Sequence, residues 1–178
     1  MQQFSDLAIT PLVLSALKKL NLIKPTPIQT LSIPLALDGK DILGTAQTGT
    51  GKTYAFGVPL VNHLTLNKDS CALILTPTRE LALQVLKALQ DLTSNKNNLD
   101  SALIIGGDSI QKQLRQLKRA RLVVGTPGRM QDHLRRKSLK LNKFDFLVLD
   151  ETDRMLDMGF VDEIKSIIEK LPTHQTLL

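Results

Sequence analysis

Short apolar runs alternate with amphipathic segments along the 178-residue chain. Five runs have the length and composition of buried strands: residues 41–45, 72–76, 101–105, 121–125 and 144–150. Apolar residues recur at helical spacing between the second and third runs, from Leu81 to Leu92. Continuous apolar strands separated by helices are typical of a parallel sheet covered on both faces. The pattern therefore predicts an α/β fold of three layers, α/β/α, around a mostly parallel central sheet.

Two Thr-Pro pairs indicate helix starts near the N-terminus. Thr10-Pro11 and Thr26-Pro27 each place a capping residue before a proline, which fits the first turn of a helix. Asp38-Gly39 then supplies an end signal for the second helix. Because ligands of open α/β sheets bind beyond the carboxyl ends of the strands, we expect the functional residues to follow the strands directly.

A glycine-rich loop lies between the first predicted strand and a helix. It reads Ala46-Gln47-Thr48-Gly49-Thr50-Gly51-Lys52-Thr53. Its glycines allow backbone angles that other residues avoid, so that amide N–H groups can face phosphates. In this pattern Lys52 reaches the β- and γ-phosphates, and the Thr53 hydroxyl ligates Mg²⁺. The loop predicts a site for a nucleoside triphosphate with magnesium, which kinases, GTPases, transporters and helicases share.

Two carboxylates end the last long apolar run. Asp150 is placed to hold Mg²⁺ through its water shell, and Glu151 to orient or deprotonate an attacking water. A carboxylate for each task indicates hydrolysis, so the predicted catalytic residues are Lys52, Asp150 and Glu151. Residues 142–145 match a guanine-binding pattern, but they precede the acidic strand instead of following it, which argues against a GTPase.

Positive charge is concentrated in the second half of the chain. The net charge is +6, and residues 112–143 contain eleven basic residues and a single acid, Asp132. Such an excess fits a polyanionic partner or a solvated, soluble face. We interpret Arg115 and Arg119 as part of the solvated face.

Cysteine and histidine carry little chemistry in this sequence. The single cysteine, Cys71, cannot form a disulfide within the chain and opens a predicted buried strand, so we expect a reducing compartment, the cytoplasm. His63, His133 and His174 show no metal-ligand spacing, and we interpret them as surface residues. No apolar run approaches the roughly 20 residues of a membrane helix.

Seven ordered motifs resemble those of the DEAD-box RNA helicases and cover nearly the whole chain. They are Lys24-Pro25-Thr26-Pro27-Ile28-Gln29 with the upstream Phe4, the loop at 46–53, Pro77-Thr78-Arg79-Glu80-Leu81-Ala82, Gly106-Gly107 with Gln113, Thr126-Pro127-Gly128-Arg129, Asp150-Glu151-Thr152-Asp153, and residues 154–160. The resemblance implies that residues 1–178 are an N-terminal RecA-like ATP-binding domain, with the adenine-reading region at residues 2–30.

The resemblance also implies a role for each matching residue. ATP would be the nucleotide, with Gln29 hydrogen-bonding the adenine edge, Phe4 stacking on its face, and Lys24 and the loop at 46–53 completing the site. Asp153 would couple this domain to a second one. The residues that would hold the RNA backbone, with little sequence preference, are Thr78, Arg79, Gly107, Gln113, Thr126, Gly128 and Arg129.

The sequence departs from the family pattern at two places. Thr152 stands where the family has alanine, but both neighbouring carboxylates are present, so we expect activity to survive. The aromatic residue expected just before Lys24 is replaced by aliphatic ones. We also expect a Ser-Ala-Thr motif and a second RecA-like domain to follow Leu178. Without that domain, residues 1–178 should be a monomer that binds nucleotide weakly and hydrolyses it negligibly.

The resemblance therefore implies an ATP-dependent RNA helicase, an RNA-stimulated ATPase of which this chain is the ATP-binding half. An ATP-gated RNA clamp that need not unwind shares the same motifs. A DNA-directed motor is a third reading, and a GTPase or small-molecule kinase is a remote fourth.

Overall fold

A computed structural model of the protein describes residues 3–45, 47, 49–93 and 99–178. Five strands form one sheet of order β2-β3-β1-β4-β5, and all neighbouring strands run parallel, which confirms the predicted sheet. The elements are η1 (Phe4–Asp6), α1 (Pro11–Lys19), α2 (Pro27–Leu37), α3 (Lys52–Leu66), β1 (Cys71–Leu75), α4 (Arg79–Thr93), β2 (Ser101–Ile104), α5 (Ile110–Leu117), β3 (Leu122–Gly125), α6 (Pro127–Arg135), β4 (Phe144–Leu149), α7 (Thr152–Asp157), α8 (Val161–Ile168) and β5 (Gln175–Leu177).

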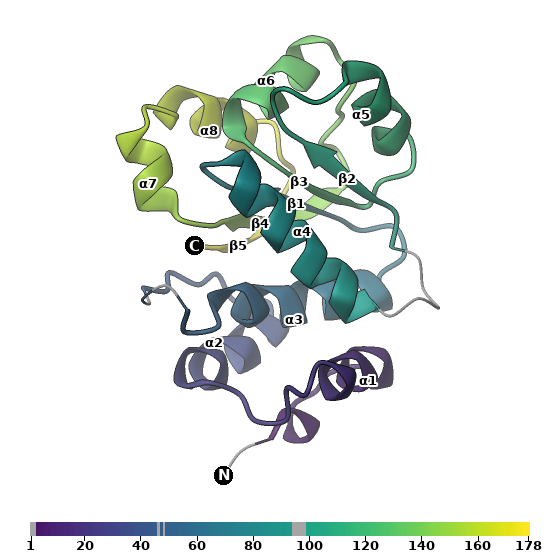
Figure 1. The fold of residues 1–178 in the computed structure, drawn as a ribbon, viewed down its shortest axis with the longest axis vertical. Helices are drawn as coiled ribbons and strands as arrows, with labels where there is room; N and C mark the ends of the chain where they lie inside the picture. The colour runs from purple at the N-terminus through teal and green to yellow at the C-terminus, as the bar shows by residue number, and fades with distance from the viewer. Residues whose placement is uncertain (1–2, 46, 48, 94–98) are drawn as a thin grey trace.

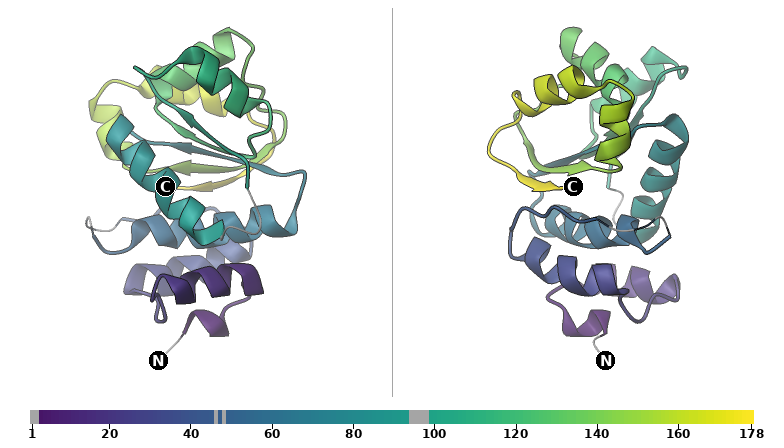
Figure 2. Two further views of the ribbon diagram at one scale, coloured as in Figure 1. Left: turned by 45° about the vertical axis from the view of Figure 1, so that its right-hand side comes forward. Right: turned by 90° about the vertical axis from the view of Figure 1, so that its left-hand side faces the viewer.

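Helices cover both faces of the sheet because successive strand residues point to opposite sides. Along β1, Ala72 and Ile74 join the cluster packed under α1–α4, whereas Leu73 and Leu75 join the cluster under α6–α8. Figures 1 and 2 show α1 and α2 outside α3 and α4, so this side carries two helical layers. The predicted α/β/α arrangement is confirmed, with the N-terminal helices added to one face.

The strand predicted at residues 41–45 is reduced to a single bridge between Ile42 and Leu177. The N–H of Ile42 donates to the carbonyl of Thr176 at 3.0 Å, and the N–H of Gly44 donates to the carbonyl of Leu178 at 2.8 Å. The segment thus runs parallel to β5 but makes too few pairs to form a strand. It still delivers the following loop to the carboxyl end of the sheet.

Two expectations from composition concern the core and the membrane. Cys71 is 8% exposed and belongs to the second core cluster, as expected of a small core residue. No helix among the described residues is long and apolar enough to cross a membrane.

Helices α3 and α4 approach each other closely at Gly57. A Cβ at this position would lie 2.8 Å from Cδ2 of Leu89, so the contact requires glycine on one helix and a well-fitted leucine on the other. Leu89 is fully buried, whereas Leu83 on the same helix is 51% exposed.

Replacing Leu89 with alanine should lower the free energy of unfolding by about 2–5 kcal/mol, because it removes buried apolar contacts and leaves a cavity. Leu83→Ala, the same change on the exposed side of α4, should cost less than about 1 kcal/mol. Urea denaturation of both variants measures the difference. Equal losses would show that α4 does not pack as described.

Candidate nucleotide and RNA sites

The ends of three neighbouring strands meet at one edge of the sheet. Leu75 pairs with Gly125 of β3 and with Leu149 of β4, so the residues that follow lie side by side. The N–H of Thr76 donates to the carbonyl of Gly125, and the N–H of Asp150 donates to the carbonyl of Leu75, both at 3.0 Å. Every motif singled out after a strand is therefore brought to this carboxyl edge, as the fold rule predicts.

The phosphate loop ends where α3 begins, at Lys52. Gly49 and Gly51 have φ of +85° and +93°, in the left-handed region that favours glycine. The Thr50 hydroxyl donates to the carbonyl of Gln47 at 2.7 Å. Ala46 and Thr48, which were also predicted to bind the nucleotide, lie outside the described residues.

Gln29 is bonded to the phosphate loop. Its side chain is 3% exposed, accepts the N–H of Thr26 at 3.0 Å, and donates through Nε2 to the carbonyl of Gly51 at 2.9 Å. The amide therefore fixes the residue immediately before Lys52. The oxygen and the nitrogen of a glutamine amide can each make a second hydrogen bond. The two bonds described here therefore leave room for a contact with adenine, and the hydrogen bond from Gln29 to the adenine edge stays a prediction.

Phe4, predicted to stack on adenine, is buried, and the stacking stays a prediction. Phe4 is 2% exposed and packs in the cluster beneath the N-terminal helices, and its N–H donates to the carbonyl of Ile23 at 3.3 Å. The ring closes the underside of this layer, so it presents no open face to a base. Lys24, the other N-terminal residue assigned to the site, is exposed.

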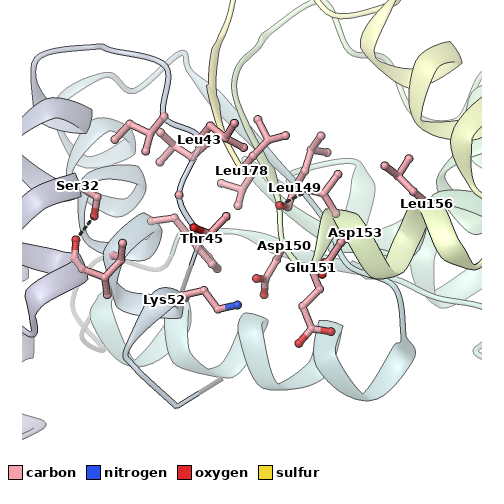
Figure 3. A pocket seen from close by; sticks show the side chains of 18 residues that line it. Ser32, Leu43, Thr45, Lys52, Leu149, Asp150, Glu151, Asp153, Leu156 and Leu178 are labelled. Atoms are coloured by element: carbon pink, nitrogen blue, oxygen red, sulfur yellow. Dashed lines mark hydrogen bonds between the residues drawn. The ribbon is translucent and has the colours of Figure 1, made fainter. Parts of the chain in front are cut away.

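Lys52 and Asp150 face one another across a cavity of about 390 Å³ (Figure 3), which Glu151 also lines. Burial raises the pKa of the Asp150 carboxyl above its usual value, and the Glu151 charge raises it further. The Lys52 charge and a hydrogen bond from the backbone of Glu151 act in the opposite direction. Asp150, Glu151 and Asp153 thus bring three carboxylates to a cavity with one ammonium group, an arrangement that a bound cation would relieve.

Glu151 has an uncommon backbone conformation. With φ of +53° and ψ of +51° it lies in the left-handed region, which is strained for a residue with a side chain. This turn ends β4 and begins α7, so that the side chains of Asp150 and Glu151 diverge in Figure 3. The Glu151 carboxylate pairs with Nη1 of Arg154 at 3.2 Å.

The turn accommodates Thr152, the departure from the family tetrapeptide. Its hydroxyl donates to the carbonyl of Leu149 at 2.9 Å, so the added polar group is satisfied within the turn. The following Asp153 is exposed and lines the same cavity as Lys52.

The residues present fit a magnesium ion that arrives with phosphate. Among residues 3–45, 47, 49–93 and 99–178 no group of three or more His, Cys, Asp or Glu side chains could hold a metal alone. Magnesium on a nucleotide needs only one or two protein ligands, because the phosphates and water supply the others. Asp150 lines the cavity and fits that requirement, whereas Thr53, half-buried in the first turn of α3, is not among the lining residues, so its contact with Mg²⁺ stays a prediction.

A second cavity, of about 440 Å³, lies beyond the ends of β1 and β3. It contains four of the predicted RNA-binding residues, Thr78, Arg79, Thr126 and Arg129. Six lining residues were not in the predicted set, among them the acids Glu80 and Asp132 and the apolar Met158 and Phe160. The complete lining is Pro77, Thr78, Arg79, Glu80, Gly106, Thr126, Arg129, Asp132, Met158 and Phe160.

Phe160 places an aromatic ring at this cavity from a distant part of the chain. Phe160 belongs to the turn between α7 and α8, outside the basic stretch at residues 112–143. A Cβ on Gly128 would lie 3.9 Å from the Phe160 ring, so the ring borders the first turn of α6. Only the fold reveals this neighbour.

Arg79 lies over the backbone of Gly106 and Gly107. A Cβ on Gly106 would lie 3.1 Å from Nη2 of Arg79, and one on Gly107 would collide with Nη1. Gly107 also has φ of +80°. The turn therefore favours glycine at position 107, and the lack of a side chain at both positions allows the close approach of the guanidinium.

Two of the predicted RNA contacts are engaged inside the protein. Gln113 is fully buried, so its predicted direct contact with RNA is wrong for this structure. Its Oε1 accepts from Nε of Arg129 at 3.3 Å, while Nη2 of Arg129 donates to the carbonyl of Asp108 at 3.0 Å. Arg129 is thus largely occupied in holding the 105–108 loop, although it still borders the cavity.

The prediction that His133 lies on the surface is wrong, because its exposed fraction is 1%. Its ring is enclosed between Gln113 and Ser138, which lie within 3 Å of its two nitrogens.

The parallel sheet, the two glycines with positive φ before α3 and the acidic end of β4 that faces Lys52 agree with the fold and the site expected from the sequence. Residues 26–178 match the profile of the DEAD/DEAH box helicases. The chain belongs to this family, and its fold is that of the family's RecA-like domain.

Named relatives and a solved structure support the assignment. The chain is 46% identical to the ATP-dependent RNA helicase DeaD of Buchnera aphidicola (subsp. Schizaphis graminum) and 44% identical to the ATP-dependent RNA helicase CshA of Listeria monocytogenes. The alignments cover 98% and 100% of this chain but only 30% and 35% of those proteins. A DEAD box protein from Methanococcus jannaschii superposes with a TM-score of 0.93 at 40% identity, covering 99% of this chain and 49% of that one.

Gly51→Ala should weaken nucleotide binding at least about tenfold, because a Cβ there would lie 2.5 Å from Nε2 of Gln29 and would strain a left-handed residue. Gly39→Ala is the matched control, since Gly39 also has a positive φ, +76°, but no atom within 4 Å of the new Cβ. The control should lower stability by about 1–2 kcal/mol without changing affinity. Titration with a fluorescent ATP analogue compares the two, and equal affinities would contradict the described Gln29 contact.

Proposed function

We propose that the chain is the ATP-binding half of an ATP-dependent RNA helicase, an RNA-stimulated ATPase. The observation that carries the proposal is the carboxyl edge of the sheet. There Lys52 faces Asp150 and Glu151, and a second cavity with Arg79 lies beside them. A site for a triphosphate thus adjoins a site for a polyanion. The names of the relatives support ATP as nucleotide and RNA as polyanion.

Each residue of the nucleotide site has a task under this proposal. Lys52 offsets the charge of the β- and γ-phosphates, and the loop amides hold the phosphate oxygens. Asp150 and Thr53 would hold Mg²⁺, which shields the phosphate charge. Glu151 accepts a proton from the attacking water once its carboxylate leaves Arg154, and its strained turn aims it away from Asp150.

RNA would be bound through its backbone. Arg79 supplies an exposed guanidinium, and Thr78 and Thr126 add hydroxyl groups at the same cavity. Gly106, Gly107 and Gly128 have no side chains of their own, and the Arg79 guanidinium lies over the first two, so a phosphate at this turn would meet Arg79 next to exposed backbone. Such contacts carry little sequence information, so we propose low sequence specificity.

The remaining elements of the proposal concern the whole protein. Hydrolysis and unwinding would need a second RecA-like domain, coupled through Asp153, whose exposed side chain lines the nucleotide cavity. The isolated chain would be monomeric. The single buried cysteine supports a cytoplasmic location. An ATP-gated RNA clamp is the alternative, and a strand-displacement assay on a two-domain protein distinguishes clamping from unwinding.

The two-domain protein should hydrolyse ATP, and RNA should stimulate this hydrolysis. Residues 1–178 alone should hydrolyse ATP about 10³-fold more slowly or slower still, because arginine residues of a facing domain contribute that much to the rate of related phosphoryl transfers. Phosphate release with and without single-stranded RNA measures both.

Within the active protein, Glu151→Gln should lower kcat about 10²–10⁴-fold while preserving ATP binding. Robust RNA-stimulated turnover by the isolated chain, or by the glutamine variant, would contradict the proposal.

Arg79→Glu should weaken RNA binding by the two-domain protein about tenfold or more and reduce its salt dependence, since one phosphate contact is lost and a repulsive charge is added. Arg115→Glu makes the same change in net charge on α5, outside the cavity lining. That control should change affinity about threefold at most. Fluorescence anisotropy at several salt concentrations tests the pair, and equal losses would favour general attraction over a defined site.

A further inference from the structure

A chain of buried hydrogen bonds lies behind the RNA cavity and joins α5 to α6. His133 of α6 and Gln113 of α5 are 1% and 0% exposed, and Nε2 of His133 lies 2.9 Å from Oε1 of Gln113. On the other side of the ring, Nδ1 lies 2.8 Å from the hydroxyl of Ser138. Figure 1 shows α5 and α6 together at the end of the molecule farthest from α1.

The neighbours of Gln113 determine which nitrogen of His133 carries the proton. Nε2 of Gln113 donates to the carbonyl of Ile105 at 2.8 Å, which fixes the orientation of the amide and leaves Oε1 as the atom facing His133. Because Oε1 can only accept, Nε2 of His133 must be the donor. Nδ1 is then the acceptor that faces the Ser138 hydroxyl at 2.8 Å, and the single proton of that hydroxyl is shared with the backbone carbonyl of His133, which lies 3.0 Å away.

The charge state of His133 agrees with this pattern. Burial lowers the pKa of the His133 imidazole, the charges of Arg129 and Arg136 lower it further, and Asp132 opposes them. A neutral ring has one donor and one acceptor, and each has a partner here.

Gln113 transmits the position of His133 to the 105–108 loop. Its Nε2 holds the carbonyl of Ile105 at the start of the loop, and its Oε1 also accepts from Arg129. Arg129 in turn holds the carbonyl of Asp108 at the end of the loop. Gly106 and Gly107, the residues that Arg79 covers, lie between these two fixed carbonyls.

We propose that His133 is a positioning residue for RNA binding: by donating to Gln113, it fixes the loop that presents the backbone of Gly106 and Gly107 under Arg79. The inference rests on the proposed RNA-binding function. This positioning role needs an Nε2–H donor next to Gln113, so an apolar ring of the same size would not restore RNA binding. If His133 only filled the core between α5 and α6, an apolar ring of the same size would serve equally well.

The test compares two substitutions in the two-domain protein. His133→Phe keeps the ring but removes both polar atoms, and should weaken binding of single-stranded RNA about three- to tenfold, the equivalent of one lost hydrogen bond. His133→Gln keeps an amide donor near the former Nε2 and should stay within about twofold of the wild type. ATP affinity should be unchanged in both variants, because the nucleotide cavity contains no residue of α5 or α6.

A matched control separates positioning from general loss of stability. His63 is hydrogen-bonded to Asp145 at 3.2 Å and does not line the RNA cavity. His63→Phe should lower the melting temperature without changing RNA affinity. Amide hydrogen exchange of Gly106, Gly107 and Asp108, measured without RNA, should be faster than wild type only in His133→Phe.

The outcomes are distinguishable. If wild-type protein binds RNA but His133→Phe binds equally well, or if the phenylalanine and glutamine variants weaken in proportion to their melting temperatures, the positioning role is overturned. If the wild type binds no RNA, the proposed function fails. The exchange experiment then still decides whether His133 fixes the loop.

Discussion

The parallel register of β1 with its two neighbours is the constraint on which both sites depend. Leu75 stands opposite Gly125 and Leu149, so the chain leaves β1, β3 and β4 at the same height. One residue of slip would turn the buried side chains of a strand to the opposite face, and both faces are filled with apolar groups. Core packing therefore fixes the edge at which Thr76, Thr126 and Asp150 emerge, before any functional contact is made.

The same register joins the two sites through β1. The carbonyl of Leu75 accepts from the N–H of Asp150, while the chain continues from Leu75 to Thr78 and Arg79. The two cavities are thus connected by one backbone hydrogen bond, from Asp150 to Leu75, and by the four residues that follow Leu75 in the chain.

Features that depend only on residues close together in the chain were predicted correctly from the sequence. The apolar strands, the turn glycines at 49 and 51, and the acidic end of β4 follow from residue type and spacing. The wrong predictions for Gln113 and His133 and the unexpected burial of Phe4 share a cause, because burial of each side chain depends on partners far along the chain. The prediction of a strand at residues 41–45 failed for a different reason. An apolar run does not reveal how many of its residues will pair with a neighbouring strand, and here Ile42 forms a single bridge with Leu177.

The buried network explains why the two arginines of the RNA cavity are not equivalent. Arg129 already donates to Gln113 and to the carbonyl of Asp108, so binding a phosphate would have to compete with contacts that hold the loop. Arg79 is exposed above Gly106 and Gly107 and has no such structural task in the turn. A fully satisfied polar network also specifies one arrangement of its members, where apolar packing tolerates several. The division of labour follows: Arg129 and His133 hold the loop in one shape, and Arg79 offers its charge to the ligand on that shape.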